Sequence, residues 1–259
     1  MTTANQKSNK VWQDEYTIHS YEVDAKGRAT LPILCQFMQE SAWNHAEHLG
    51  LGFDHLFEQN SVWVIARQCM QIQRFPKWGE TIYVQTWPTG KDRILRYRDF
   101  KILDAQNRVI GKTTSAWLVI DIHTRKPKRS SSYFHIDAGE YEQVLPGKLR
   151  TRLDVPQNIE FTKSLEVTYK DLDFHEHVNN VRYIEWILDG FTLEFRKEHT
   201  LQEAEIHYLA EALYHDTLTV NFEKHEDFSY AHNIVREHDL KELCKARTLW
   251  QPNGEQQAK

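Results

Sequence analysis

The segment from Asp173 to Asn180 carries side chains of the types that transfer protons in catalysis. Asp173, His175 and His177 occupy every second position, so in an extended backbone a carboxylate and two imidazoles share one face. Imidazole exchanges protons near neutral pH, and a neighbouring carboxylate can fix its tautomer or join it in activating water. This spacing indicates general acid–base chemistry.

An amphipathic helix should follow this segment. Apolar residues recur at helical intervals at Val181, Ile184, Leu188, Phe191 and Phe195. Asn179 and Asn180 stand where short polar side chains cap a helix start. Backbone N–H groups from Val178 to Asn180 would face a ligand carbonyl held there, at the positive end of the helix dipole. Each such donor could stabilise an oxyanion by on the order of 3 kcal/mol.

The elements that position this segment occur in the same order in both halves of the chain. The first half predicts a strand over 15–23, a helix from Thr30 to Gly50 with Pro32 in its first turn, and strands over 62–75, 80–87, 93–103 and 108–122. A turn is expected at 88–90. The second half predicts a strand over 161–172, a helix to about 199, and strands over 204–212, 216–223, 228–237 and 242–250.

The two halves also match residue by residue at a constant offset. Among the matched pairs are Asp24 with Asp173, Leu34 with Tyr183 and Met38 with Ile187. Opposite His175 and His177, however, the first half has Lys26 and Arg28. We therefore expect the second half to hold the chemistry and the first half to shape a binding pocket.

A strand, a helix and an antiparallel sheet, repeated, predict an α+β protein of two units, each with its helix on a curved sheet. We expect a first unit over 1–124 after a disordered tail at 1–10, a linker over 125–160, and a second unit over 161–259. The linker carries most of the irregular, proline- and serine-rich sequence.

Composition excludes several classes of protein. The chain has 259 residues, of which 40% are hydrophobic and 27% charged, typical of a globular protein. A net charge of −5 argues against a nucleic-acid partner, and no apolar run could span a membrane. The first ten residues lack the apolar stretch of a secretory signal, so we expect a cytoplasmic location. Cys35, Cys69 and Cys244 are spaced too widely for a metal or redox motif and are expected in the core.

The central stretch DLDFHEHVNNVRYIEWIL resembles the D-L-D-x-N-x-H-V-N-N-V-x-Y-I-x-W signature of the fatty acyl-ACP thioesterases of plants and bacteria. The run LEFRKEH, ending at His199, is similar to that family's L-E-Y-R-R-E-C. The resemblance covers nearly the whole chain. It implies a tandem (double) hotdog fold and hydrolysis of the thioester that joins a fatty acyl chain to acyl carrier protein, without a cofactor or metal.

Carried over by position, the resemblance makes Asp173, His177 and Glu198 catalytic, with Asn179 and Asn180 supporting the site. Glu198, aided by His177, would take a proton from water. His175 stands where the family has Asn, and it could replace the amide as a donor or take no part. His199 stands where many plant members have Cys, which excludes a Cys nucleophile at that position.

Each of these residues also has a structural interpretation. Asp173 and the two asparagines could be turn and cap residues only, and Glu198 could be a solvated charge. His175 and His177 could hold zinc, although a zinc site needs three or four ligands.

The acyl chain and the carrier protein need surfaces of their own. Four first-half residues are candidates for both core and acyl pocket: Trp63, Ile65, Trp87 and Trp117. Basic residues that could receive an acidic carrier protein are Arg125, Lys126, Lys128, Arg129, Lys148, Arg150 and Arg152. The alternative functions are an acyl-CoA thioesterase and a non-catalytic module that binds acyl thioesters. Two paired units in one chain suit a monomer as well as a homodimer.

Overall fold

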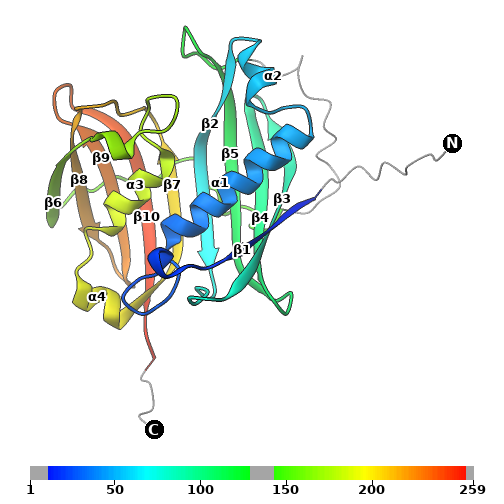
Figure 1. The fold of residues 1–259 in the computed structure, drawn as a ribbon. Coiled ribbons are helices and arrows are strands. Elements are labelled where there is room, and N and C mark those ends of the chain that lie inside the picture. The colour runs from blue at the N-terminus through cyan, green and yellow to red at the C-terminus, as the bar shows by residue number, and fades with distance from the viewer. Residues whose placement is uncertain (1–10, 129–142, 255–259) are drawn as a thin grey trace.

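The computed structural model describes residues 11–128 and 143–254, which form one antiparallel ten-stranded sheet with the helices packed on one face (Figure 1). The strand order is β1-β3-β4-β5-β2-β7-β10-β9-β8-β6. First-half strands are β1 (Trp12–Thr17), β2 (Ser61–Ile72), β3 (Thr81–Asp92), β4 (Leu95–Asp104) and β5 (Val109–Asp121). Second-half strands are β6 (Phe161–Glu166), β7 (His199–Tyr208), β8 (Thr217–Lys224), β9 (Ser229–Arg236) and β10 (Lys241–Pro252). The helices are α1 (Leu31–His48), α2 (Phe53–Phe57), α3 (Asn180–Leu188) and α4 (Leu193–Glu198).

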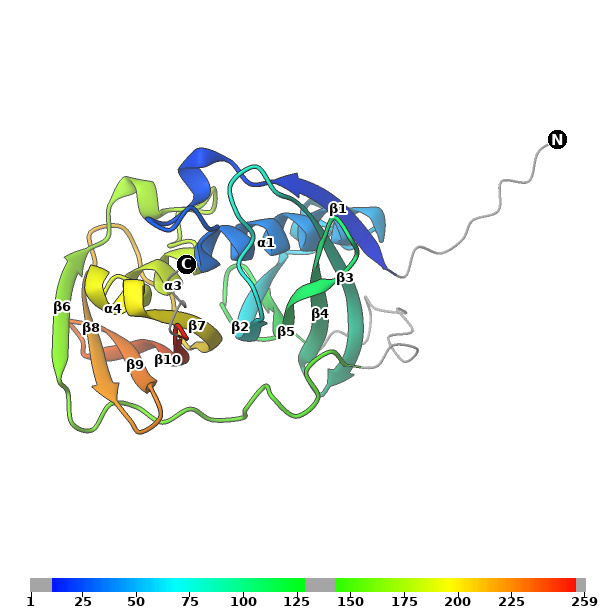
Figure 2. The ribbon, with the colours of Figure 1, turned by 90° about the horizontal axis from the view of Figure 1, so that it is seen from below.

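The two halves join edge to edge at the centre of the sheet. Strand β2 pairs with β7, from Arg67 opposite His207 to Gln71 opposite Glu203. The sheet curves around α1 and α3, as Figure 2 shows. The predicted α+β double hotdog is therefore confirmed, with both units sharing one continuous sheet.

The sequence repeat is also a structural repeat. Each half begins with a short strand and a single 3-10 turn, Ser20–Glu22 in one half and Tyr169–Asp171 in the other. An isolated bridge then closes a loop in each half: Val23 with Ala29, and Leu172 with Val178. The offset of 149 is the same for all of these features, so the loop that precedes each helix has one geometry.

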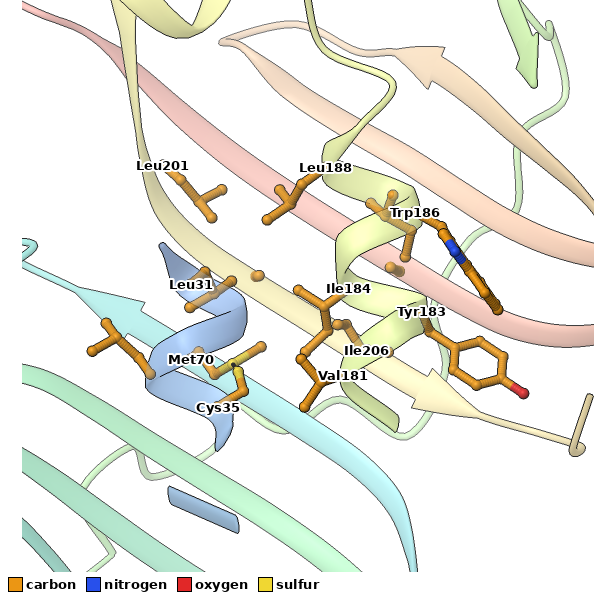
Figure 3. Packing of buried hydrophobic residues seen from close by; sticks show 14 of the residues in the cluster. Leu31, Cys35, Met70, Val181, Tyr183, Ile184, Trp186, Leu188, Leu201 and Ile206 are labelled. Carbon is orange, nitrogen blue, oxygen red and sulfur yellow. Dashed lines mark hydrogen bonds between the residues drawn. The ribbon is translucent and has the colours of Figure 1, made fainter. Parts of the chain in front are cut away.

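Helix α1 begins as its sequence predicts. Thr30 caps it by accepting the backbone N–H of Ile33, and Pro32 lies in the first turn, where its missing N–H costs nothing. Its buried face packs against α3 over the β2–β7 seam (Figure 3), where the contacting side chains include Leu31, Cys35, Met70, Val181, Ile184 and Ile206. Burying each large aliphatic side chain here stabilises the fold by about 1.5–3 kcal/mol. All three cysteines are buried, as expected.

Several predicted boundaries are wrong, among them those of the strands expected over 15–23 and 161–172, which are Trp12–Thr17 and Phe161–Glu166. Strand β3 does not end at Trp87 but runs to Asp92, because an irregularity in register between Pro88 and Gly90 absorbs the proline, and the turn falls at Arg93 with φ 49°.

The second helix is not continuous to residue 199. It ends at Leu188, and α4 starts anew behind the cap of Thr192. A Cβ at Gly190 would lie 1.8 Å from the ring of Phe222, so the chain passes this ring only without a side chain. Helix α2 was not predicted, and β7 begins five residues earlier than expected.

The described part of the linker crosses the outer face of the sheet (Figure 2). Its backbone N–H groups bind carboxylates that project from the strands. Val144 N–H donates to Asp99 at 2.6 Å, and Arg150 N–H donates to Glu205 at 2.6 Å. Among residues 11–128 and 143–254, no helix is both long enough and apolar enough to span a bilayer.

Candidate active site

Asp173 holds the loop before α3 in a closed turn. Its Oδ1 accepts the backbone N–H of His175 at 2.8 Å and of His177 at 3.3 Å, while its own N–H donates to the carbonyl oxygen of His177 at 2.8 Å. Glu176 completes the turn with φ 63°, where the first-half loop has Gly27 with φ 68°. A non-glycine residue in this region is uncommon and strained, which is typical of functional loops.

This turn separates the two imidazoles that the sequence predicted on one face. The alternation argument needed an extended backbone, and residues 173–177 are not extended. His175 packs against the rings of Phe53 and Phe174, with centroids 4.9 and 3.9 Å away. His177 lies instead beside Glu211, with its Nδ1 3.3 Å from Oε2 of that carboxylate.

Glu211 is a site residue that the sequence analysis missed. It follows the end of β7 and also forms an ion pair with Arg125, which lies just after β5. The neighbouring Ala212 ties this segment to the loop, because its carbonyl oxygen accepts the N–H of Val178 at 3.3 Å. A lone carboxylate in the apolar run Leu209–Leu213 was the available signal.

Glu198 does not join this group. It is exposed at the last position of α4, and its carbonyl oxygen accepts the N–H of Asn253 at 2.7 Å. All ten residues of β7 separate Glu198 from the end of the sheet where Glu211 lies, a distance of roughly 30 Å along an extended strand. His199 opens β7 with its ring stacked on Phe195. The expected pair of Glu198 with His177 is therefore not brought together.

Both imidazoles favour the neutral form. Burial lowers the pKa of His177 below its ordinary value of 6.5, and the charge of Arg125 lowers it further, against the opposing effect of Asp173. Burial likewise lowers the pKa of His175. A neutral imidazole can accept a proton from water at neutral pH, which is the state a general base requires.

The start of α3 offers fewer free donors than expected. Asn179 caps the helix by accepting the N–H of Val181 at 2.9 Å. The N–H groups of Val178 and Asn179 already donate, to Ala212 and Asp171. Asn180 is the first helical residue, whose N–H has no acceptor within the helix, and it lines the adjoining cavity. Of the three N–H groups expected to bind an oxyanion, that of Asn180 is therefore the one left for this role among the described residues.

An apolar cavity of about 210 Å³ opens beside this loop. It is bounded by Asp173, Phe174 and His175, by α1 and α2, and by first-half strands. Trp63 and Trp117 line it, with the Trp63 indole N–H bound to the carbonyl oxygen of Leu51 at 3.2 Å.

The other two predicted pocket residues lie elsewhere. Ile65 lines a second, much smaller cavity that also reaches Asn180. Trp87 does not line the larger cavity but is buried, with the Lys101 ammonium 5.5 Å from its ring.

Most of the basic residues expected at a carrier surface already have acidic partners. Lys128 lies 3.1 Å from Asp121, Lys148 3.8 Å from Glu203, and Arg150 3.6 Å from Glu205. Lys126 and Arg152 are exposed, whereas Arg129 lies outside the described residues.

Residues 9–134 and 156–252 match the N-terminal and C-terminal domains of acyl-ACP thioesterases. A chloroplastic acyl-[acyl-carrier-protein] hydrolase of Cuphea viscosissima is 27% identical over 94% of this chain. Oleoyl-acyl carrier protein thioesterase 1 of Arabidopsis thaliana is 26% identical over 92%. The chain spans 63% and 75% of these two relatives.

Solved structures agree with these matches. An acyl-ACP thioesterase from Bacteroides thetaiotaomicron superimposes with a TM-score of 0.86 at 27% identity, covering 95% of this chain and 100% of that one. The 12:0-ACP thioesterase from Umbellularia californica has the same fold, with a TM-score of 0.85 at 22% identity over 94% and 98% of the two chains. With both of its halves matched, the chain belongs to the acyl-ACP thioesterase family.

Proposed function

We propose that this protein hydrolyses the thioester of fatty acyl-acyl carrier protein, giving a free fatty acid and holo-carrier protein. Family membership supports this reaction. The observation that carries the proposal is the contact of His177 with Glu211, beside a helix start that borders an apolar cavity. Water, a general base, an oxyanion donor and a place for the acyl chain are what thioester hydrolysis needs.

In this mechanism, His177 and Glu211 take a proton from water, and the water oxygen attacks the carbonyl carbon. The Asn180 N–H stabilises the resulting oxyanion, and the C–S bond breaks as the pantetheine sulfur leaves and regains a proton. Asp173 positions the loop, and Glu211 takes the role first assigned to Glu198. His175, at the cavity edge, is placed to donate to the substrate in the position of the family's Asn.

The test is release of free thiol from acyl carrier protein substrates of graded acyl length, alongside the matching CoA thioesters. We expect faster turnover of the carrier-linked series. Faster turnover of the CoA series would favour an acyl-CoA thioesterase, and tight binding without thiol release would favour a non-catalytic module.

The acid limb of the pH profile is expected to report on His177. Because the pKa of His177 lies below 6.5, kcat/KM should fall only as the pH drops through that lower value. Arg125→Met removes a positive charge that opposes protonation, so the limb should move to higher pH. The pH profiles of wild type and variant on one substrate check this. If the acid limb does not move, the charge of Arg125 does not act on the group that titrates there.

Recognition of an acidic carrier should weaken with salt. We expect activity on the carrier-linked substrate to fall with ionic strength more steeply than activity on the CoA thioester, because exposed charges are screened within about 10 Å at 0.1 M salt. Lys126→Glu should reduce the salt-sensitive part of the activity on the carrier-linked substrate. Lys148→Glu, at a residue beside Glu203, is the comparison variant. Equal salt slopes for both substrates would argue against electrostatic docking.

We also propose the division into units over 1–124 and 161–259 joined by a linker, a cytoplasmic location, and a monomer or homodimer. Limited proteolysis tests the division, and sedimentation tests the oligomeric state.

A further inference from the structure

Arg98 on β4 is one of three basic residues, with Lys91 and Arg96, on the wall of a cavity whose lining is otherwise mostly apolar. One guanidinium nitrogen, Nη1, lies 3.1 Å from Nδ1 of His45 and donates to Oγ1 of Thr86, also at 3.1 Å. His45 belongs to α1 and is fully buried, and Thr86 belongs to β3. Arg98 is thus fixed between helix and sheet rather than free to swing into solvent.

Arg98 lies across the sheet from the proposed reaction centre. The start of α3 lies over β7, where the Tyr208 hydroxyl donates to the carbonyl oxygen of Asn180 at 3.3 Å. From β7 the sheet continues through β2 and β5 to β4. Three strand spacings of about 4.8 Å each make roughly 14 Å. An acyl chain that enters beside Asn180 and extends into the cavity therefore approaches the guanidinium with its methyl end.

The charge of Arg98 has no acidic neighbour to offset it. Within residues 11–128 and 143–254, no carboxylate lies within ion-pair distance of this guanidinium, and both of its contacts are to uncharged groups. Burial lowers the pKa of Arg98 to about 10, which still leaves it protonated at neutral pH. A methyl group pressed against such a cation would remove its remaining hydration and return no hydrogen bond.

We propose that Arg98, held by His45 and Thr86, closes the acyl pocket and sets the longest chain that the enzyme accepts. The proposal rests on the proposed function, because it takes the occupant of the cavity to be a fatty acyl chain. Each added methylene that packs on the apolar walls strengthens binding until the chain reaches Arg98. Beyond that point, added carbons meet a polar surface and do not strengthen binding.

Two substitutions separate charge from shape. Arg98→Met leaves an unbranched apolar side chain, and Arg98→Lys keeps a cation of similar reach. Thr86 retains a partner in either variant, because its hydroxyl also donates to the carbonyl oxygen of Asp99 at 3.0 Å. Thermal melting of each variant checks that the fold is kept.

The experiment measures kcat/KM for carrier-linked chains of increasing length, together with the affinity of the matching free fatty acids. The binding measurement does not depend on hydrolysis, so it tests Arg98 even if the proposed reaction is wrong. In Arg98→Met we expect the longest accepted chain to grow, with roughly fourfold better binding for each methylene past the wild-type limit. Arg98→Lys should keep that limit.

A terminal hydroxyl provides the complementary test. On the first chain that the wild type rejects, a hydroxyl at the far end should restore binding to the wild type, because it accepts a hydrogen bond from Arg98, and should do so less in Arg98→Met. The proposal is overturned if Arg98→Met keeps the wild-type length profile while melting normally. Equal binding of methyl-ended and hydroxyl-ended chains by the wild type would also overturn it.

Discussion

Glu211→Gln is expected to lower kcat on acyl carrier protein substrates by about 10²–10⁴-fold, the usual contribution of a general acid–base group. The amide keeps the shape of the side chain but cannot accept a proton, and it loses the charge that faces Nδ1 of His177 at 3.3 Å. KM should change little, because Glu211 lies beside the loop and does not line the acyl cavity. Steady-state kinetics on one good substrate measures both quantities.

Glu198→Gln is the matched control for this prediction. It makes the same chemical change at the carboxylate that the motif first suggested, at the far end of β7. We expect nearly wild-type kcat from this variant. The opposite ranking, with a severe loss in Glu198→Gln and a mild one in Glu211→Gln, would show that the contact between His177 and Glu211 is not the catalytic one.

Asp173→Ala is expected to reduce kcat/KM by about a hundredfold or more, because displacement of a catalytic group by about 1 Å can have an effect of that size. Without the carboxylate, the N–H groups of His175 and His177 lose their acceptor and the loop is free to open. Loss of these charged hydrogen bonds should also cost about 1.5–3 kcal/mol of stability.

The repeat supplies an internal control for this effect. Asp24 makes the same bonds in the first half, accepting the N–H groups of Lys26 at 2.8 Å and Arg28 at 3.1 Å. Because Asp24 also forms an ion pair with Arg28, Asp24→Ala should destabilise the protein by at least as much while leaving kcat/KM close to wild type. Melting temperatures and kinetics of the two variants decide the matter. Equal losses of activity would mean that Asp173 acts only through stability.

The two loops show how one backbone design serves two purposes. Both close on an aspartate, both use a positive φ three residues later, and both lead into a helix. The first carries Lys26 and Arg28, whereas the second carries His175 and His177. Only the second has groups that exchange protons near neutral pH, so we expect the chemistry in that half, while the first half supplies α1, α2 and most of the cavity wall.

Local pattern determined a large part of this protein. The capping residue Thr30, the early Pro32 and the spacing of apolar residues suffice to predict α1, because helix starts and faces are set by neighbours in the chain. The offset of 149 predicted the doubled fold for a similar reason: matching local signals recur in the same order. The motif around His177 and Asn180 located the loop and the helix start correctly.

Only the tertiary structure decided which carboxylate His177 meets. Glu198 lies closer to His177 in sequence and belongs to a run similar to a family motif. However, β7 takes the chain from one end of the sheet to the other, and Glu211, which follows β7, lies at the end where His177 is. The contact depends on where a strand ends and on the ion pair with Arg125, at the start of the linker, and neither is encoded in local spacing. Likewise, no periodicity in β4 shows that Arg98, on the cavity wall, contacts His45 of α1, because that contact is made by packing between elements distant in the chain.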